Sequence, residues 1–423
     1  MVDAHRTFVI VGGGLAAAKA AGTLRTEGFT GRVILIGDER DHPYERPPLS
    51  KGYLAGGEER ASVFVQDAAW YAKHEIELHL GQSVTALDRA GHCVHLGDGS
   101  SMRYDKLLLA TGAEPRRLDI PGTDLAGVHH LRRLAHADRL RQVLTSLGRD
   151  NGHIVIAGAG WIGLEVAAAA RTYGAEVTVV EAESTPLHRV IGPELGQLFT
   201  DLHSEHGVRF HFGARLTGIV GQDGVVLAAR TDDGEEHPAH DVLAAIGAAP
   251  RVSLAESAGL AVAGPAEGGG IVVDAGLRTS DPDVFAAGDV VSAPSPWGAA
   301  AGGRIRVEHW ENALEGGPAA ARAMLGQEVA YDRVPYFFSD QYDLGLEYSG
   351  WAPPGSYDEV VVRGDAGKRE FIAFWLGEGR VLAGMNVNVW DVTDDIQRLI
   401  RSGAAVDKDA LADPGTPLGS IGG

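Results

Sequence analysis

The sequence predicts an α/β protein with two nucleotide-binding halves, followed by a smaller α+β domain at the C-terminus. Three observations lead to this prediction. A strand, glycine turn, helix and second strand follow one another at the N-terminus, and the same order returns 146 positions later, from Gly12 to Gly158. From about residue 327 the pattern changes to aromatic-rich, alternating runs that are typical of antiparallel strands.

The composition excludes several classes of protein. The chain has 423 residues, of which 44% are hydrophobic and 22% charged, so it can bury large cores and does not resemble a disordered protein. Its formal net charge of −20 disfavours nucleic acids and anionic membranes as partners. The apolar runs are far shorter than the ~20 residues that cross a bilayer, and we expect a cytoplasmic protein.

The first glycine motif is Gly12-x-Gly14-x-x-Ala17, placed between the apolar strand FVIV and an alanine-rich helix. In such a turn the first glycine permits the tight bend, the second lets the backbone approach a pyrophosphate, and the small third residue allows close packing. Asp38 stands 21 positions after Ala17, where an acid is expected to bind ribose hydroxyls. Glu39 is an alternative for this role. The unit therefore predicts a Rossmann-type dinucleotide site.

The second motif, Gly158-x-Gly160-x-x-Gly163, repeats the device, and Glu181 ends the strand that follows. A carboxylate at this position accepts hydrogen bonds from the adenosine ribose and repels a 2′-phosphate, which favours NADH over NADPH. Arg189 lies nearby and leaves NADPH open, because a mobile guanidinium can accommodate a phosphate.

Further strands end in glycine, as in KLLLATG and in VFAAGD, which ends at Asp289 and is preceded by Thr279. Together with the two glycine motifs, these segments resemble the flavoproteins that bind two dinucleotides. The resemblance implies FAD in the first site, with Asp289 bound to it. Disulfide reductases of that fold need a cysteine pair, whereas Cys93 is the only cysteine here, so thiol-disulfide chemistry is excluded.

The segments PYERPPLSKGYLAG, GWIGLEVAAA, VEHWENAL and FFSDQYDLGL together resemble the NADH-dependent ferredoxin reductases of bacterial oxygenases. This resemblance runs through all three domains. It implies a discontinuous FAD domain (1–112 and 248–326), an inserted NAD domain (113–247) and a C-terminal domain that helps dock the ferredoxin (327–405). Residues 406–423 have little periodicity and are expected to form a loosely attached tail.

The resemblance also implies site residues. For FAD, Ala16 and Asp38 are implied at the adenosine, Val84 at the adenine and Arg132 at the phosphates. Lys51 is implied at the isoalloxazine, and Asp289 and Trp310 at the ribitol and ring. For NAD, Ile162 joins the glycine motif, Glu181 and Arg189.

Lys51, Glu165 and Trp161 are the candidate catalytic residues. In similar proteins the glutamate pairs with the flavin-side lysine, so we expect a Lys51–Glu165 ion pair, and an ammonium near the flavin would stabilise the charge gained on reduction. The alternatives are a solvated Lys51, a Glu165 that only matches the helix dipole, and a Trp161 packed in a core.

The implied reaction passes hydride from NADH to N5 of FAD, then single electrons to a 2Fe–2S ferredoxin that feeds a monooxygenase or dioxygenase. A rubredoxin reductase, a redox-sensing protein like the apoptosis-inducing factors, and an NADH oxidase remain as alternatives. No metal site is expected from the two histidine pairs, His203 with His206 and His129 with His130, because each lacks a third ligand. We expect these histidines to lie on the surface. The ferredoxin contacts suggested by the sequence are Arg116, Arg117, Arg304, Arg306, Trp351 and Trp375.

Overall fold

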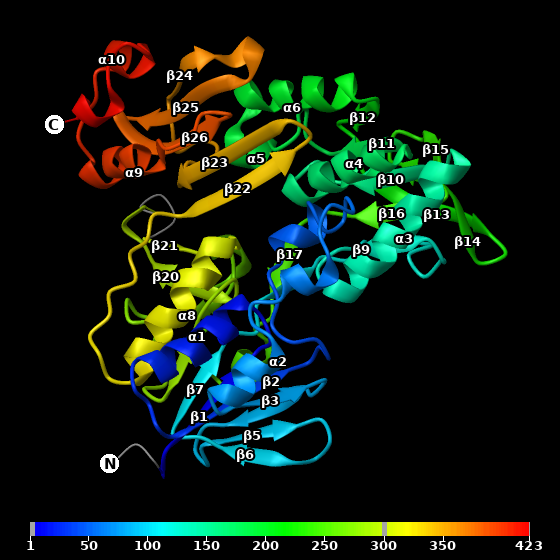
Figure 1. Cartoon of the computed structure of the whole chain (residues 1–423). Coiled ribbons are helices and arrows are strands. Elements are labelled where there is room, and N and C mark those ends of the chain that lie inside the picture. The colour runs from blue at the N-terminus through cyan, green and yellow to red at the C-terminus, as the bar shows by residue number, and fades with distance from the viewer. Residues whose placement is uncertain (1–4, 298–302, 423) are drawn as a thin grey trace. The chain divides into compact units, whose positions relative to one another are not determined.

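The computed structural model describes residues 5–297 and 303–422. The chain divides into two units (Figure 1). Unit 1 comprises Met1–Glu45, Ala61–Glu114 and Ala249–Tyr336, and unit 2 comprises Arg46–Arg60, Pro115–Ala248 and Phe337–Gly423. The short segment that carries PPLSK therefore groups with unit 2 and not with the glycine motif that precedes it.

Unit 1 is built on a five-stranded parallel sheet with the order β19-β7-β1-β2-β3. The central strands are continuous apolar runs and are buried, as expected for a parallel sheet covered on both faces. Strand β1 lies between β2 and β7, so the glycine turn that follows it opens at the middle of the sheet. The strands are β1 (Thr7–Val11), β2 (Arg32–Gly37), β3 (Ile76–Leu80), β7 (Lys106–Leu109) and β19 (Val284–Ala286).

Helices α1 (Leu15–Thr26) and α8 (Trp310–Met324) pack side by side in unit 1 (Figure 1). Their facing residues are small. A Cβ on Gly317 would lie 2.3 Å from the carbonyl oxygen of Ala16, so only glycine allows this approach. The close pair fixes the start of α1, where the first glycine motif ends.

The remaining elements of unit 1 surround this sheet. Strands β4, β5 and β6 form one three-stranded antiparallel sheet, and β18, β20 and β21 form another sheet. Their bounds, with those of the two short helices, are β4 (Val84–Asp88), β5 (Cys93–Leu96), β6 (Ser101–Arg103), β18 (Ile271–Val272), β20 (Val291–Pro294), β21 (Arg304–Ile305), α2 (Ala68–Lys73) and α7 (Ser253–Ser257).

The middle of unit 2 repeats the same architecture, as the sequence predicts. Its parallel sheet has the order β12-β11-β10-β16-β9, with β10 at the centre and helix α4 beginning within the second glycine motif. The elements are β9 (Val128–His130), α3 (Leu134–Asp150), β10 (His153–Ala157), α4 (Trp161–Tyr173), β11 (Glu176–Glu181), α5 (His188–Ile191), α6 (Pro193–Glu205), β12 (Val208–Phe212) and β16 (Asp241–Ala244).

A second, antiparallel sheet packs against this parallel sheet within unit 2. It consists of β13 (Leu216–Gln222), β14 (Val225–Thr231) and β15 (Glu236–Pro238). Ile219, Val226 and Ala229 share a buried apolar cluster with Val155 and Val180 of the parallel sheet. The connecting strands β8 (Ala113–Pro115) and β17 (Ala248–Pro250) pair in a two-stranded sheet of their own.

The C-terminal part of unit 2 is an antiparallel five-stranded sheet with the order β22-β23-β26-β25-β24, covered by helices. This confirms the α+β prediction. Trp375 is fully buried in its core. The elements are β22 (Tyr336–Gln341), β23 (Leu344–Gly350), β24 (Glu359–Asp365), β25 (Glu370–Gly377), β26 (Arg380–Val387), α9 (Thr393–Ser402) and α10 (Lys408–Ala412).

The last residues are not the loose tail that the sequence suggested. Leu411 and Leu418 are buried. Two arginines hold the intervening turns: Arg363 donates to the carbonyl oxygens of Asp413 and Thr416, and Arg398 donates to that of Leu418. These irregular turns are anchored by side chains of strand β24 and helix α9, which leave no periodicity in the local sequence.

No helix in the described part of the chain is both long and apolar enough to span a lipid bilayer.

Candidate functional site

The first glycine turn has the shape that a dinucleotide needs. Gly12 has a φ of 137°, and a Cβ there would lie 2.1 Å from the carbonyl oxygen of Ala110, so the position requires glycine. A Cβ on Gly14 would instead enter open space at the start of α1. Ala16 and Ala17 are buried beneath the turn. The helix N-terminus therefore presents free backbone next to a space where phosphates can bind.

Both acids proposed for the ribose follow strand β2 in unit 1. Asp38 forms an ion pair with Arg251, with 3.0 Å between Oδ2 and Nη2. Glu39 accepts a 2.6 Å hydrogen bond from the hydroxyl of Tyr44. Both carboxylates stand at the end of the strand, so the structure leaves the choice between them open.

Other residues proposed for FAD occupy the neighbouring strand and helix ends of unit 1. Gly288, before Asp289, has a φ of 80°, and a Cβ there would lie 3.3 Å from the Cβ of Ala16, so this turn reaches the start of α1. Trp310 begins α8 and donates its indole N–H to Glu45 at 2.8 Å. Val84 begins β4.

Thr279 has a structural role in the turn before β19. Its hydroxyl donates to the carbonyl oxygen of Val284 at 2.9 Å and accepts from the backbone of Asp281. These bonds account for the presence of Thr279 before VFAAGD without a role at the cofactor.

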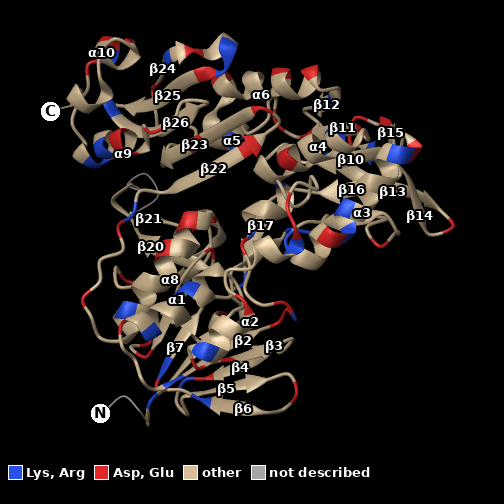
Figure 2. Ribbon diagram, viewed as in Figure 1, with Lys and Arg blue, Asp and Glu red and all other residues tan. Residues whose placement is uncertain are grey.

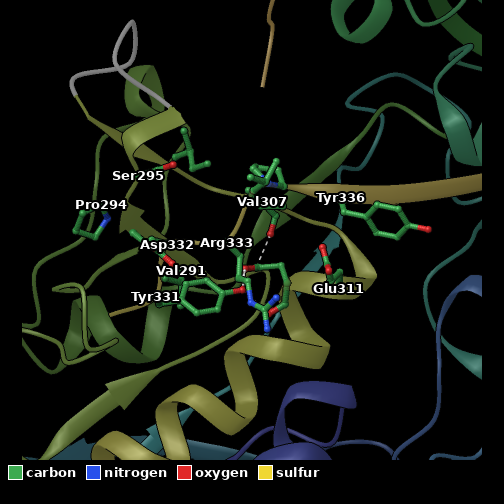
Figure 3. Close-up of a pocket in the computed structure, with 14 residues that line it drawn as sticks. Val291, Pro294, Ser295, Val307, Glu311, Tyr331, Asp332, Arg333 and Tyr336 are labelled. Atoms are coloured by element: carbon green, nitrogen blue, oxygen red, sulfur yellow. Dashed lines mark hydrogen bonds between the residues drawn. The ribbon is translucent and has the colours of Figure 1, made fainter. Parts of the chain in front are cut away.

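A small pocket of unit 1 lies beside β20 and β21 (Figure 3). Asn312 donates to the carbonyl oxygen of Val307 at 2.8 Å and accepts from the hydroxyl of Tyr331 at 2.9 Å. These bonds brace the VEHWEN segment that carries Trp310. None of the glycine-turn residues lines the pocket, so it is separate from the dinucleotide turn.

The second glycine turn, in unit 2, has the same design. Gly158 has a φ of 102°, and a Cβ there would lie 2.5 Å from the carbonyl oxygen of Ala245. A Cβ on Gly163 would lie 2.1 Å from the carbonyl oxygen of Gly158, whereas one on Gly160 would meet nothing within 4 Å. Ile162, in the first turn of α4, is 42% exposed and is available to a bound coenzyme.

Glu181 ends strand β11 and Arg189 lies on helix α5, both in unit 2. Glu181 accepts from the backbone N–H of Ala159 at 2.6 Å and from that of Glu183 at 2.9 Å. Its carboxylate is thus held beside the glycine motif. Arg189 is 75% exposed and pairs with Glu183 at 2.7 Å, a partner that the sequence analysis did not identify. The exposed pair is weak, so Arg189 remains able to move.

The predicted ion pair is present: the Nζ of Lys51 lies 2.7 Å from Oε1 of Glu165. Glu165 is only 4% exposed, although it stands in the first turns of α4. Ser50 donates to its Oε2, and Ser339 of β22 donates to its Oε1 at 2.6 Å. A buried carboxylate is stable only when its oxygens are bonded, and here three donors satisfy it. Ser339 was missed because it lies 174 positions from Glu165.

The network continues from Ser339 to two further polar residues of unit 2. Gln341 donates to the hydroxyl of Ser339 at 3.1 Å, and its Oε1 lies 2.8 Å from Nε2 of His203. His203 is fully buried on α6, and burial lowers its pKa to about 4. The prediction that His203 is a surface residue was wrong, because its helix packs this face against β22. Its neighbour His206 is exposed, as expected.

His129 was also assigned to the surface, and it is buried instead. Its Nε2 lies 2.6 Å from a carboxylate oxygen of Asp241 on the adjacent strand β16. The pair satisfies a polar group within the parallel sheet, so it has a structural explanation.

Trp161 packs in unit 2 between Phe337, with 4.9 Å between ring centroids, and Phe199, at 5.7 Å. These contacts favour the packing alternative, in which Trp161 anchors the N-terminus of α4. Lys51 lies 5.4 Å from the ring centroid of Phe338. Arg132 also belongs to unit 2, and its carbonyl oxygen accepts from Arg46.

The residues proposed for ferredoxin docking differ in availability. Arg304 donates to the carbonyl oxygens of Val273 and Ser292, and Arg306 donates to that of Gly268, so both brace unit 1. Arg116 and Arg117 are exposed. Basic and acidic residues are interspersed along the ribbon in the view of Figure 2.

The tryptophans proposed as partner contacts differ in the same way. Trp375 is fully buried and cannot contact a partner, and Trp351 is half-buried. Trp390, which the sequence analysis did not consider, is 53% exposed.

Comparison with known proteins agrees with this architecture. The family model described as pyridine nucleotide-disulphide oxidoreductase matches residues 6–317, and the model described as reductase C-terminal matches residues 336–421. The ferredoxin–NAD(+) reductase component of the anthranilate 1,2-dioxygenase system of Burkholderia cepacia is 40% identical over 408 residues, covering 96% of this chain and 97% of that protein. Putidaredoxin reductase CamA of Pseudomonas putida is 34% identical and covers 99% and 97%.

Solved structures give the same result. The ferredoxin reductase for the CYP199A2 system of Rhodopseudomonas palustris has a TM-score of 0.91 and 36% identity, covering 98% of this chain and 99% of that one. The reductase in the covalent putidaredoxin reductase–putidaredoxin complex has a TM-score of 0.90 and 34% identity, covering 98% and 97%. The chain belongs to the pyridine nucleotide-disulphide oxidoreductase family and, within it, to the NADH-dependent ferredoxin reductases of oxygenase systems.

Proposed function

We propose that this chain is an FAD-dependent NADH:ferredoxin reductase that passes electrons from NADH to a 2Fe–2S ferredoxin of a monooxygenase or dioxygenase system. The observation that carries the proposal is the buried Lys51–Glu165 pair, in a chain that has two open glycine turns and a single cysteine. A family member without a cysteine pair must deliver its electrons to an acceptor outside the chain.

FAD, when bound, supplies the conversion of one two-electron donor into two one-electron deliveries. The chain supplies position and charge. We assign to the flavin the residues of the first turn and its surroundings in unit 1, which are Gly12, Gly14, Ala16, Ala17, Asp38, Val84, Asp289 and Trp310, and, from the family resemblance alone, Arg132 of unit 2. Their placement at strand and helix ends fits an extended dinucleotide.

Lys51 is the proposed catalytic residue. Its ammonium is held by Glu165, and Glu165 is held by Ser50 and Ser339. The positive charge therefore stays in place while the flavin is reduced. A preorganised positive charge stabilises negative charge that develops during reduction without reorganising at that moment. Ser50 and Ser339 act through Glu165 and are positioning residues.

Glu181 is the proposed determinant of coenzyme choice, with Gly158, Gly160, Ile162, Gly163 and Arg189 completing the NAD site. Its carboxylate already stands beside the backbone of the glycine motif, where an adenosine ribose can donate to it. A 2′-phosphate would meet this negative charge, and Arg189 would have to leave Glu183 to offset it. NADH is therefore the preferred donor.

Ferredoxins are usually acidic and this chain is acidic as well, so docking requires local basic groups. Arg116 and Arg117 are the better candidates because they are exposed, whereas Arg304 and Arg306 bind backbone within unit 1. We further propose that the enzyme works in the cytoplasm, where cell fractionation would detect it.

The test is NADH-driven reduction of cytochrome c by the purified protein, with and without a 2Fe–2S ferredoxin, repeated with NADPH. Strong stimulation by ferredoxin, greater with NADH, is expected. Rapid dye reduction that ferredoxin does not stimulate, but rubredoxin does, would move the assignment to a rubredoxin reductase. Slow turnover with NADH-dependent dimerisation would indicate a redox-sensing protein, and protein purified without flavin would contradict the whole proposal.

A further inference from the structure

Two histidines and a glutamate meet at the edge of the second parallel sheet, away from the glycine turn. His211 lies on β12, Glu235 lies at the turn between β14 and β15, and His237 lies on β15. One potential ligand atom from each of the three side chains lies within 4.8 Å of the other two. This group has no local signature in the sequence, because His211 lies 24 and 26 positions before Glu235 and His237 and stands on a different strand.

Asp233 sets the orientation of His211. Nε2 of His211 lies 2.7 Å from Oδ2 of Asp233, and Nδ1 lies 3.6 Å from Oε2 of Glu235. Asp233 is held in turn by the hydroxyl of Thr231 at 2.6 Å and by the backbone N–H of Glu235. A carboxylate acceptor at Nε2 keeps the ring proton there and leaves Nδ1 facing Glu235.

This carboxylate–histidine arrangement is the one by which proteins orient the imidazole ligands of metal ions. The carboxylate fixes the tautomer and makes the opposite nitrogen a better donor. Asp233 therefore orients His211 without binding the metal itself. Glu235 faces Nδ1 of His211, which is the nitrogen that would bind a metal ion.

His237 supplies the second nitrogen. Its ring lies 4.9 Å from the ring of His211, and its Nε2 is shielded from solvent and forms no hydrogen bond with any described residue. A buried polar atom without a hydrogen bond is rare in proteins, and a bound ion is one explanation for it.

We propose that His211, His237 and Glu235 form a binding site for a divalent transition-metal ion such as Zn²⁺. Two imidazole nitrogens and one carboxylate oxygen are the donors that zinc accepts, and they disfavour Mg²⁺ and Ca²⁺, which prefer oxygen alone. Ligands of a tetrahedral zinc stand about 3.4 Å apart, given bonds of about 2.1 Å. The side chains need only close by a small rotation at the exposed turn, and a fourth position remains for water.

The ion would tie the β14–β15 turn to strand β12 within unit 2. It takes no part in the proposed electron transfer, because its ligands are distinct from Lys51, Glu165 and the glycine motifs. Bound metal is therefore expected to stabilise the folded protein by an amount that increases with the concentration of free metal.

The test uses the FAD-loaded, full-length enzyme, stripped with a chelator and then freed of it. Zn²⁺ is titrated by calorimetry, and Co²⁺ is followed by difference absorption, which reports tetrahedral coordination. His237→Ala removes a ligand, and His95→Ala, which removes an exposed histidine of unit 1, is the matched control. FAD content and NADH-dependent activity without metal verify that each variant is folded.

We expect the unaltered protein and His95→Ala to bind one equivalent of Zn²⁺ that His237→Ala loses, with an increase in melting temperature confined to the first two proteins. Glu235→Gln should weaken binding at least tenfold. Equal zinc stoichiometry and affinity in His237→Ala and the control, or no binding below millimolar Zn²⁺, would overturn the proposal.

Discussion

Replacing Glu165 with glutamine keeps the volume of the side chain and removes its charge. The amide can still accept from Lys51, but its NH₂ group must then face one of the two serines, whose hydroxyls both donate to the carboxylate now. The variant removes the carboxylate that pairs directly with the ammonium of Lys51 in a nearly closed site, where Lys51 is 13% exposed and Glu165 4% exposed. We expect Glu165→Gln to lower both the stability and the rate of flavin reduction.

The magnitude follows from the burial. Removing one partner of a buried ion pair costs about 3 to 5 kcal/mol because the remaining charge is uncompensated. Lys51 retains some access to water, so the lower end, about 3 kcal/mol, applies. For a unit the size of unit 2, each kcal/mol lowers the melting temperature by about 2–4 °C, which gives a decrease of about 6–12 °C.

The assay is calorimetric melting of the FAD-loaded protein, with Glu183→Gln as the matched control. That variant also removes a carboxylate paired with a cation, but Arg189 is 75% exposed and the pair contributes less than about 1 kcal/mol. Ser339→Ala, which removes only one donor to Glu165, should fall between the two. Equal melting temperatures for Glu165→Gln and Glu183→Gln would refute the argument that burial makes the Lys51 pair strong.

Three further predictions concern the proposed roles and the buried histidine. Lys51→Ala should slow flavin reduction by NADH in stopped flow by about tenfold, about 1.4 kcal/mol, while FAD is retained; an unchanged rate would remove Lys51 from the mechanism. Glu181→Ala should lower the NADH-to-NADPH ratio of kcat/KM by about tenfold, and a constant ratio would show that the carboxylate does not read the ribose. The pKa of His203 is about 4 in the folded protein, against 6.5 for an ordinary histidine. The neutral side chain therefore makes its full contribution to the stability of the fold above pH 6.5, and this contribution is lost as the pH falls toward 4. The loss is about 3 kcal/mol, and the melting temperature of His203→Gln should fall less steeply over that range.

The features predicted correctly from the sequence are those with local signatures. Gly12 and Gly158 mark their turns in the sequence because only glycine fits there. Each has a φ above 100°, and a Cβ added at either position would lie 2.1–2.5 Å from a carbonyl oxygen. The parallel strands were recognised because strands buried on both faces read as continuous apolar runs. The Lys51–Glu165 pair was expected from family resemblance, and spacing alone would not have indicated it.

The features that were missed depend on distant partners. His203 lies on an amphipathic helix, and nothing in its neighbours shows that Gln341 of β22 will meet it. The C-terminal turns are held by Arg363 and Arg398 from other elements, so their own sequence looks like a tail. Local periodicity predicts which face of an element is buried, but it does not predict which polar group of another element will pack against that face.

The polar contacts of unit 2 explain why residues 46–60 group with it. Ser50 and Lys51 bind Glu165, and the hydroxyl of Tyr173 donates to the carbonyl oxygen of Leu54 at 3.0 Å. Ser339 then joins the same carboxylate from the C-terminal sheet. One buried glutamate thus gathers three segments that are remote in sequence, and each donor it binds reduces the freedom of the others. The position of Lys51 therefore depends on β22 as much as on α4, so substitutions in the C-terminal sheet should alter flavin reduction even where they touch neither coenzyme.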